Sequence, residues 1–261
     1  MSGGGTTAPA AIAAAVAQQN AEVLAGLVVV QTLAPGTPTY YGPRLSAVDP
    51  RTGAFRSGTP ETGVASCAAV LLARRYGMAC DCYGPSSDSR VADAQFGAEH
   101  ALNALLGMLA RPRFLSGVGD VAAGASSSLE ALVIDDDILG DVFYALTPRP
   151  WDDRALDVGA IVETVLGGKG FLASRHTRRY LRGELVAPLL RSRAAGRSPC
   201  SYGLAGLARE RVAELLEREP VGLPADTLTA MCAQIDACAR ELGLPEWPDP
   251  RRLLEERANR R

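Results

Sequence analysis

Four polar side chains follow a short stretch of the sequence that is compatible with a β-strand. Ala79 to Tyr83 can form this strand, which Gly84 and Pro85 then end. The polar residues lie in the loop beyond it or on the first turns of the next helix, and they are Asp88, Asp93, Gln95 and Glu99. In α/β folds, ligands bind at the carboxyl ends of the strands. We therefore expect this end of the strand to carry a ligand site.

A glycine-rich segment near the N-terminus is a second candidate. It is predicted to be a loop that ends in N-cap threonines, with Pro9 near the first turn of a helix from Ala10 to Gln31. Glycine-rich loops at helix starts can cradle anions. The segment has no dinucleotide-binding fingerprint and no P-loop lysine, so a tight turn without a ligand is the simpler alternative.

The two histidines, His100 and His176, do not indicate a conventional catalytic centre. His100 follows Glu99 on the same predicted helix and is expected to pack or to lie at the surface. His176 follows a glycine loop, where a ligand contact and a structural hydrogen bond both remain open. So few histidines form neither a Ser-His-Asp triad nor a metal-ligand set. The six cysteines lack the usual zinc-site spacing, and we predict no metal.

Three strand–loop–helix units are predicted to position these residues. The strands are expected at Pro38–Gly42, Ala79–Tyr83 and Arg113–Gly117, and the helices at Val64–Tyr76, from Ala92 onward, and at Leu129–Leu146. They recur at intervals of roughly 35 to 45 residues, which is typical of a parallel α/β architecture, either a barrel or an open sheet.

The segments around these units complete the predicted topology. Arg44 to Pro60 is expected to be a long loop, of a length that often forms a functional lid. The helix from Ala10 to Gln31 is apolar nearly all round, so we expect it to be buried. A further helix is predicted at Ala155–Leu166, and from roughly Arg191 the pattern indicates amphipathic helices.

Composition sets the broad class of the protein. A chain of 261 residues suits one domain or two small ones, and its 47% apolar and 21% charged residues are ordinary for a globular protein. The net charge of −2 gives no reason to expect nucleic acid or an anionic membrane as a partner. The N-terminus lacks the charged region of a signal peptide, and the apolar run Val23–Val30 is too short to span a bilayer. We expect a cytoplasmic protein.

Eight motifs in a fixed order carry a resemblance to a known family. They are SGGGTTAPA, AEVLAGLVVVQ, PGTPTYYG, DPRTGAFRSGTPE, ARRYGM, SDSRVADAQFGAE, SSSLEALVIDDDILG and GGKGFLASRHT. From Ser2 to about Arg193 the chain resembles the trimethylamine methyltransferase family. The resemblance implies a TIM barrel that passes a methyl group from a quaternary or tertiary amine to the Co(I) corrinoid of a partner protein, in methanogenesis-related one-carbon metabolism. No pyrrolysine is present, so the resemblance points to the branch that uses betaines.

The chain departs from the family in length. Family members are considerably longer, and a TIM barrel needs eight βα units in about 200 residues or more. We therefore expect an incomplete TIM barrel, or half-barrel, over residues 1–193, and a helical C-terminal extension over residues 194–261. The alternative to an active enzyme is a truncated, non-catalytic half-barrel that binds a partner subunit. A homo-oligomer or the missing half of the barrel would then be its partner.

The resemblance also implies a site for a quaternary ammonium ion, which has no N–H group and is held by aromatic faces and carboxylates. The expected substrate-binding residues are Tyr41, Glu61, Tyr83, Asp88, Gln95, Glu99, Phe114 and His176. The candidates for contact with an anion or the corrinoid are Gly3, Gly4, Gly5 and Thr6. Alternatively, the strand aromatics pack the core. Cobalt is the nucleophile, so the protein needs no acid–base pair.

Overall fold

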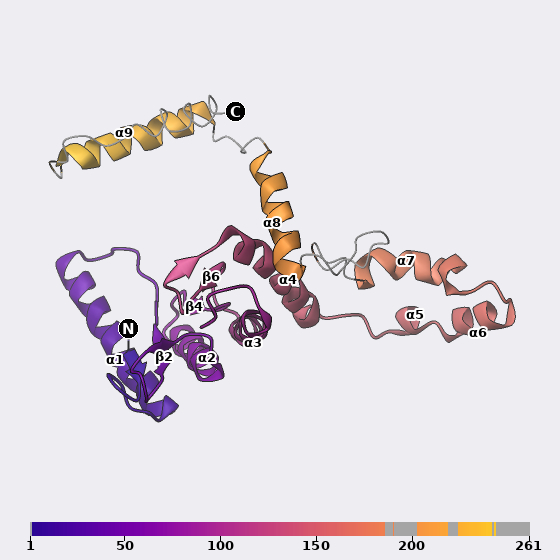
Figure 1. Cartoon of the computed structure of the whole chain (residues 1–261), viewed down its shortest axis with the longest axis horizontal. Helices are drawn as coiled ribbons and strands as arrows, with labels where there is room; N and C mark the ends of the chain where they lie inside the picture. The colour runs from indigo at the N-terminus through magenta and orange to yellow at the C-terminus, as the bar shows by residue number, and fades with distance from the viewer. Residues whose placement is uncertain (1, 186–189, 191–202, 219–223, 242, 244–261) are drawn as a thin grey trace. The chain divides into compact units, whose positions relative to one another are not determined.

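The computed structural model describes residues 2–185, 190, 203–218, 224–241 and 243 (Figure 1). The chain divides into a compact unit of residues 1–215 and a second unit of residues 216–261. The described part of the second unit contains helix α9 (Ala225–Glu241). The first unit contains the sheets and the other helices, and it carries the candidate site.

A parallel pair of strands, β4 (Asp81–Tyr83) and β5 (Phe114–Ser116), forms the centre of the first unit. A parallel bridge between Tyr41 and Cys80 adds a third extended segment beside β4. The predicted strands at Ala79–Tyr83 and Arg113–Gly117 are therefore confirmed in shortened form. The predicted strand at Pro38–Gly42 is reduced to the single bridge.

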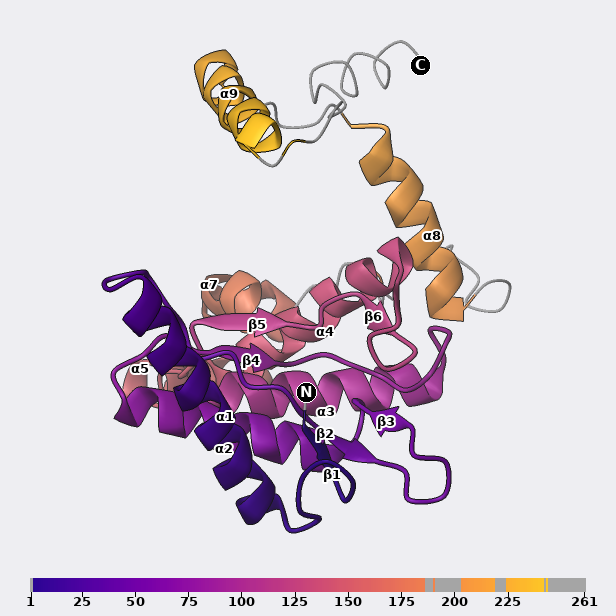
Figure 2. The ribbon, with the colours of Figure 1, turned by 90° about the vertical axis from the view of Figure 1, so that its left-hand side faces the viewer.

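Three helices follow the three extended segments, as the spacing predicts. They are α2 (Pro60–Arg75), α3 (Ala94–Ala110) and α4 (Leu129–Leu146). Local caps set the starts of α3 and α4, since the Asp93 side chain accepts the Phe96 N–H and Ser128 accepts the Ala131 N–H. Helices α2 and α3 contact β4, and Figure 2 shows the β4–β5 pair above them.

A second, three-stranded sheet was not predicted. Strand β1 (Ser2–Gly4) pairs in parallel with β2 (Leu45–Val48), which pairs in antiparallel with β3 (Phe55–Arg56). Residues Ser2–Gly4 therefore form a strand instead of a loop, and the predicted loop from Arg44 to Pro60 contains a hairpin. A turn at Asp49–Gly53 closes it, because Gly53 adopts a φ of +72° and donates its N–H to the Asp49 carbonyl oxygen.

Helix α1 (Ile12–Leu33) is largely exposed, so the prediction that it is buried is wrong. Its buried residues are Ala15, Val16 and Gln19, and the valines of its C-terminal half lie at the surface. Ala11 is its N-cap and makes no side-chain hydrogen bond, so the predicted threonine caps do not serve this helix. By length and composition the whole of α1 could cross a membrane, whereas its run Val23–Val30 alone is too short. Core helices and N-terminal signal sequences share these properties.

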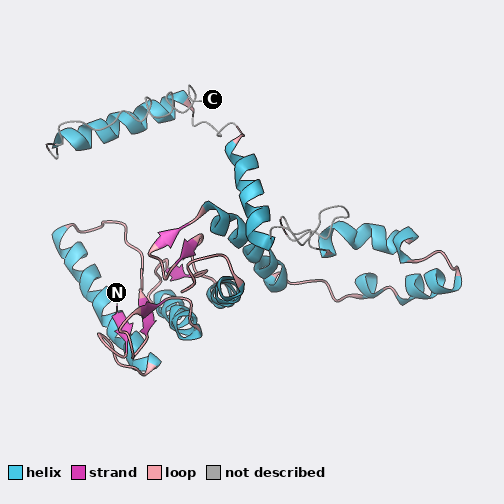
Figure 3. Ribbon diagram, viewed as in Figure 1, coloured by secondary structure: helices cyan, strands magenta, loops and turns pink. Residues whose placement is uncertain are grey.

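The segment after α4 is helical (Figure 3). The predicted helix at Ala155–Leu166 is divided at Asp157, which has a φ of 30°. The elements are α5 (Asp153–Leu156), α6 (Val158–Leu166), η1 (Phe171–Ala173), α7 (Arg175–Glu184) and α8 (Gly203–Leu216). Between β5 and α4, β6 (Asp120–Val121) and β7 (Ser126–Ser127) form a short hairpin.

The described residues form a mixed α/β structure with small sheets and no closed barrel. Of the expected half-barrel, the described residues show only the parallel arrangement of strands that are followed by helices. Helix α8, which we had assigned to a C-terminal extension, packs into the core of the first unit: Ala208 belongs to one buried cluster with Phe96 and Ile134. Residues 191–202, where that extension was expected to begin, lie outside the described residues.

Candidate functional site

The alternation of side chains along β4 gives the parallel pair two different faces. Cys80 and Cys82 are buried against α2 and belong to a core cluster with Tyr41 and Ala69. Burial raises the pKa of the Cys80 thiol to about 11 and that of Cys82 to about 12, so both thiols stay protonated at neutral pH. Asp81 and Tyr83 therefore lie on the opposite face.

This opposite face combines aromatic rings with charged groups. The strand register places Phe114 beside Asp81 and Ser116 beside Tyr83. The ring of Tyr40 packs edge-on against Phe114, with 6.1 Å between the ring centroids. We call this surface the aromatic sheet face, and its residues are Tyr40, Arg44, Asp81, Tyr83, Phe114 and Ser116. Tyr40 is 56% exposed and Phe114 is 55% exposed, so a ligand can reach two of its rings.

Arg44 connects the charged residues of the aromatic sheet face. Its Nη2 group forms an ion pair with Asp81 and donates a hydrogen bond to Ser116 Oγ at 3.2 Å. Its guanidinium carbon lies 5.6 Å from the centroid of the Tyr83 ring. A cation at this distance is attracted by the face of the ring.

The Tyr83 hydroxyl is held at both of its hydrogen-bonding positions. It donates to Asp120 Oδ2 at 2.9 Å and accepts from Ser86 Oγ at 3.2 Å. Burial raises the pKa of Tyr83, the Ser86 hydrogen bond opposes this effect, and the nearby Asp120 carboxylate adds to it. Tyr83 is therefore neutral at physiological pH, and Asp120 brings a second carboxylate to the edge of the aromatic sheet face.

Three of the four polar residues that were expected beyond β4, namely Asp88, Gln95 and Glu99, come together and bind one another. The Glu99 carboxylate accepts hydrogen bonds from Ser87 Oγ at 2.6 Å, from the Asp88 N–H at 2.9 Å and from Gln95 Nε2 at 3.0 Å. Ser86 Oγ, 2.7 Å from Ser57 Oγ, connects this group to Tyr83. We call the group the strand-end network, and its members are Ser57, Ser86, Ser87, Asp88, Gln95 and Glu99.

Asp88 ties the strand-end network to the loop before α2. Its Oδ1 accepts the N–H groups of Ser57 at 2.8 Å and Gly58 at 3.2 Å, and Arg56 Nε lies 3.3 Å from its Oδ2. Gly58 allows this close approach, because a Cβ atom there would lie 2.3 Å from Glu99 Oε2. The Asp88 carboxylate thus binds the loop before α2, and the Glu99 carboxylate binds the loop that follows β4.

The remaining predicted residues lie elsewhere. Tyr41 is fully buried on the helix side of the sheet, where its hydroxyl donates to Asn20 Oδ1 at 2.9 Å. Burial raises the pKa of Tyr41 to about 12. Glu61 is exposed on the first turn of α2, and Asp93 caps α3. His176 Nε2 lies 2.9 Å from the Ala155 carbonyl oxygen. The structure therefore does not bring all of the predicted substrate-binding residues around one cavity.

The glycine-rich segment uses its own N–H groups. Gly3 donates to Thr7 Oγ1 at 2.8 Å, Gly5 donates to the Ala8 carbonyl oxygen at 2.9 Å, and Thr6 donates to the Gly3 carbonyl oxygen at 3.0 Å. These three N–H groups are thus not available to an anion, and contact of the segment with an anion or the corrinoid stays a prediction. Gly3 is instead required for packing, since a Cβ atom there would lie 2.8 Å from Val48 Cγ2.

Sequence reasoning missed Arg44, Asp81 and Asp120 as members of the site. Asp81 could have been predicted from the alternation of side chains, because Asp81 lies two residues before Tyr83 and must be on the same face of the strand. Arg44 lies four residues after Tyr40, so the same alternation places it with Tyr40 if the segment is extended. Asp120 gives no such signal, because a loop and a two-residue strand bring it to Tyr83.

A buried His–Asp pair was also missed. His100 Nδ1 lies 2.6 Å from Asp135 Oδ1, and both side chains have zero exposure. Asp135 Oδ2 accepts the Gly119 N–H at 2.6 Å, and the Phe96 ring stacks on His100 with 3.8 Å between the centroids. The sequence pattern predicts His100 only as a packing or surface residue and does not single out Asp135.

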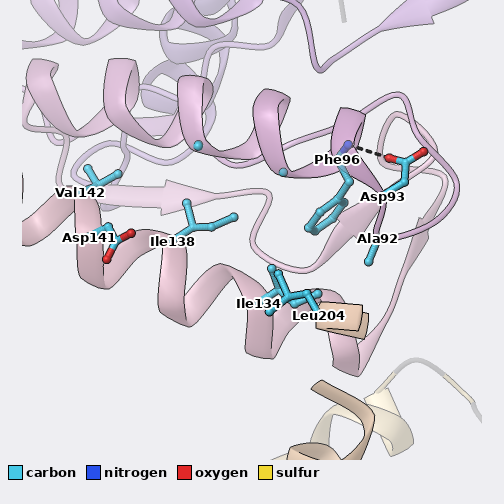
Figure 4. A pocket seen from close by; sticks show the side chains of 10 residues that line it. Ala92, Asp93, Phe96, Ile134, Ile138, Asp141, Val142 and Leu204 are labelled. Carbon is cyan, nitrogen blue, oxygen red and sulfur yellow. Dashed lines mark hydrogen bonds between the residues drawn. The ribbon is translucent and has the colours of Figure 1, made fainter. Parts of the chain in front are cut away.

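A pocket of about 290 Å³ lies away from the strand ends, between α3, α4 and α8 (Figure 4). Its walls are mainly apolar and include Phe96, Ile134, Ile138 and Leu204. The Asp93 carboxylate at its rim already caps the Phe96 N–H. The aromatic sheet face is therefore the better candidate for a charged ligand.

Comparison with known proteins gives consistent matches. The family model described as trimethylamine methyltransferase (MTTB) matches residues 2–242. Trimethylamine methyltransferase MttB of Methanosarcina thermophila is 34% identical over 236 residues, which are 89% of this chain and 48% of the relative. Glycine betaine methyltransferase of Desulfitobacterium hafniense is 33% identical over 192 residues, 73% of this chain and 40% of the relative.

A third relative, the proline betaine:corrinoid methyltransferase of Eubacterium limosum, is 30% identical over 231 residues, which are 85% of this chain and 46% of the relative. The chain thus spans about half the length of the curated relatives that it matches.

Proposed function

Because the chain belongs to the trimethylamine methyltransferase family, we propose that it binds a methylated amine or betaine for methyl transfer to a corrinoid. The corrinoid is carried by a partner protein. The observation that supports this function is the aromatic sheet face, where three aromatic rings lie beside two carboxylates, those of Asp81 and Asp120.

The chemistry of a quaternary ammonium ion matches this surface. The ion cannot donate an N–H hydrogen bond, so its recognition depends on ring faces and negative charge. Tyr40 and Phe114 supply exposed rings, and Tyr83 supplies a ring fixed by its hydroxyl. The Asp81 and Asp120 carboxylates outnumber the single Arg44 guanidinium, which favours a cation.

Arg44 favours a betaine over a simple amine as the substrate. A betaine carries a carboxylate a few bonds from its cationic nitrogen, and a guanidinium group is suited to bind it. The Arg44 side chain is 36% exposed beside the Tyr83 ring, although its Nη2 already contacts Asp81 and Ser116 and its Nη1 donates to the Pro43 carbonyl oxygen at 2.7 Å. Two of the relatives are named for betaines, which agrees with this choice.

The residues of this chain hold and orient the substrate. The cobalt of the partner's corrinoid supplies the nucleophile, so the amine leaves with the electron pair of the broken N–C bond. The rings and carboxylates would therefore fix the N–methyl bond in line with the corrinoid. The strand-end network keeps the loops beside Tyr83 in place. No described residue is assigned to the corrinoid itself.

We further propose a cytoplasmic protein that associates with a corrinoid protein and with a second copy or a partner subunit. The exposed apolar side chains of α1 support association, because contiguous apolar surface favours a protein partner. The net charge of −2 does not favour nucleic acid.

A methyl-transfer assay tests the proposed function. The chain, together with a Co(I) corrinoid protein, is incubated with glycine betaine, proline betaine and trimethylamine, and methyl–cobalt formation is followed by absorbance. We expect turnover with at least one betaine, and a loss of turnover in Phe114→Ala at subsaturating substrate. Tyr41→Phe is the control, because Tyr41 lies on the opposite side of the sheet. No transfer from any methylated amine would overturn the proposed function.

A further inference from the structure

The loop between β5 and β6 directly precedes Asp120 and is hydrogen-bonded to helix α4. Gly119 precedes Asp120, and both polar groups of the Gly119 backbone are used: its N–H donates to Asp135 Oδ2 at 2.6 Å, and its carbonyl oxygen accepts the Ser128 N–H at 3.1 Å. Gly119 has a φ of +83°. The position of the next residue, Asp120, therefore depends on the Asp135 carboxylate.

His100 in turn orients Asp135. The 2.6 Å contact with His100 Nδ1 fixes Asp135 Oδ1, the carboxylate oxygen that the Gly119 N–H does not use. The two contacting groups come from different elements, α3 and the β5–β6 loop, and they leave Asp135 little freedom to rotate. The pair has no exposed surface, so this arrangement is built into the core and is not a surface contact.

From Asp120 the connection continues to the aromatic sheet face. Asp120 Oδ2 accepts the Tyr83 hydroxyl at 2.9 Å, and its Oδ1 accepts from Ser127 Oγ at 3.3 Å. Displacement of the Gly119 peptide would move the negative charge of the Asp120 carboxylate away from the Tyr83 ring and from a cation bound there. The contacts thus run without a gap from His100 through Asp135 and Gly119 to the candidate site.

We propose that His100 and Asp135 are positioning residues that hold Asp120 at Tyr83 and thereby set the affinity of the aromatic sheet face for its cationic ligand. This inference rests on the proposed function. Packing alone does not require an ionisable pair at this position. His100 Nε2 is buried without a hydrogen-bond partner in the described structure, and this burial costs free energy. A histidine at this position is therefore explained by its other ring nitrogen, Nδ1, which contacts Asp135.

Two substitutions disrupt the contacts that Asp135 makes with His100 and Gly119, and one substitution retains them. Asp135→Asn keeps the size of the side chain but leaves only one oxygen to accept two N–H groups. His100→Leu removes the donor to Asp135, whereas His100→Gln retains an N–H group within reach of it. Asp137→Asn is the matched control, because Asp137 is a buried acid on the same helix whose Oδ2 accepts the Leu190 N–H instead of the Gly119 N–H.

The first measurement is amide hydrogen exchange at Gly119, which needs no ligand. We expect exchange to be at least roughly tenfold faster in Asp135→Asn and in His100→Leu than in the wild type. In both variants the hydrogen bond from the Gly119 N–H to Asp135 is weakened, so local opening exposes this N–H group to solvent more often. His100→Gln and Asp137→Asn should leave it unchanged. Unchanged exchange in the two disruptive variants would overturn the anchoring of the loop.

The second measurement is the dissociation constant for glycine betaine by calorimetry. Affinity should fall about tenfold in Asp135→Asn and in His100→Leu, and it should stay near the wild-type value in His100→Gln and Asp137→Asn. If Asp135→Asn does not fold, the comparison of His100→Leu with His100→Gln decides. Faster Gly119 exchange with unchanged affinity would make the pair merely structural and overturn the inference. Absence of binding in the wild type would overturn the proposed function and the affinity effect with it, while the exchange data still decide whether the pair holds the loop.

Discussion

The guanidinium carbon of Arg44 lies 5.6 Å from the centroid of the Tyr83 ring, on the face of the β4–β5 pair opposite to α2. This contact joins a positive charge, an aromatic ring and the Asp81 carboxylate within one small surface. It supports our proposal that the aromatic sheet face, rather than the strand-end network, binds the ligand. The carboxylates of the network already accept hydrogen bonds from the protein.

Tyr83 should contribute to binding through its ring and to stability through its hydroxyl. Tyr83→Ala removes the ring and should weaken glycine betaine binding by roughly 0.5–2 kcal/mol. Tyr83→Phe keeps the ring and should bind nearly normally, but it should lower the free energy of unfolding by about 0.5–1.5 kcal/mol, because Asp120 and Ser86 lose a partner. Calorimetry and urea denaturation measure the two effects. Equal losses of affinity in both variants would assign the binding to the hydroxyl.

Gly58 should be essential for the strand-end network. A Cβ atom at this position would lie 2.3 Å from Glu99 Oε2 and 3.0 Å from the Asp88 nitrogen. Gly58→Ala should therefore lower the free energy of unfolding by about 1–3 kcal/mol. Gly97→Ala on α3 is the control: a Cβ atom there meets nothing within 4 Å, and the change should stabilise the helix by roughly 0.5–1 kcal/mol. Similar effects of the two substitutions would contradict the close packing at Gly58.

Tyr41 should make stability fall at alkaline pH. Burial raises its pKa from 10 to about 12 in the folded state, so the folded protein keeps the phenolic proton more tightly than the unfolded chain. The associated stability is present below pH 10 and is lost as the pH rises from about 10 to about 12, by roughly 1–3 kcal/mol. Tyr41→Phe should remove this part of the pH dependence. Unfolding free energies at pH 9 and 11.5 give the test, and identical slopes for both proteins would count against it.

The exposed apolar side chains of α1 should drive association of the chain. Val28, Val29 and Leu33 lie at the surface, and substitution of Val29 and Leu33 by Glu should shift the protein toward smaller species in light scattering. The double substitution of Ala13 and Ala14 by Glu, at exposed positions near the start of the same helix, is the charge-matched control. A wild-type protein that is monodisperse and monomeric at micromolar concentration would disprove the prediction.

Local signals allowed the helices and two strands to be predicted. Helix α4 has the predicted bounds because Ser128 caps it and apolar residues repeat along it at helical spacing. The strands β2 and β3 were not predicted, since both are short: β2 depends on pairing with β1, more than 40 residues away in the sequence, and β3 depends in turn on pairing with β2. Apolar composition alone also gave the wrong burial for α1, because burial depends on what packs against a helix.

The candidate site could be predicted only in part for a similar reason. Asp88, Gln95 and Glu99 meet because they follow one strand end, which is a local property of the sequence. The choice between Tyr40 and Tyr41 depends on register: the bridge to Cys80 turns Tyr41 toward α2 and leaves Tyr40 with Phe114. The placement of Asp120 and of the His100–Asp135 pair depends on loop and helix packing, which no spacing in the sequence encodes.

The most direct test of cation recognition compares glycine betaine with 3,3-dimethylbutanoate by calorimetry. The second compound has the same shape and the same carboxylate, but carbon replaces the cationic nitrogen. If the rings of Tyr40, Tyr83 and Phe114 and the nearby carboxylates bind a quaternary ammonium ion, glycine betaine should bind more tightly by roughly 0.5–2 kcal/mol, and Tyr83→Ala should reduce this difference. Equal affinity for the two compounds, or no binding of either, would contradict the assignment of the aromatic sheet face as the substrate site.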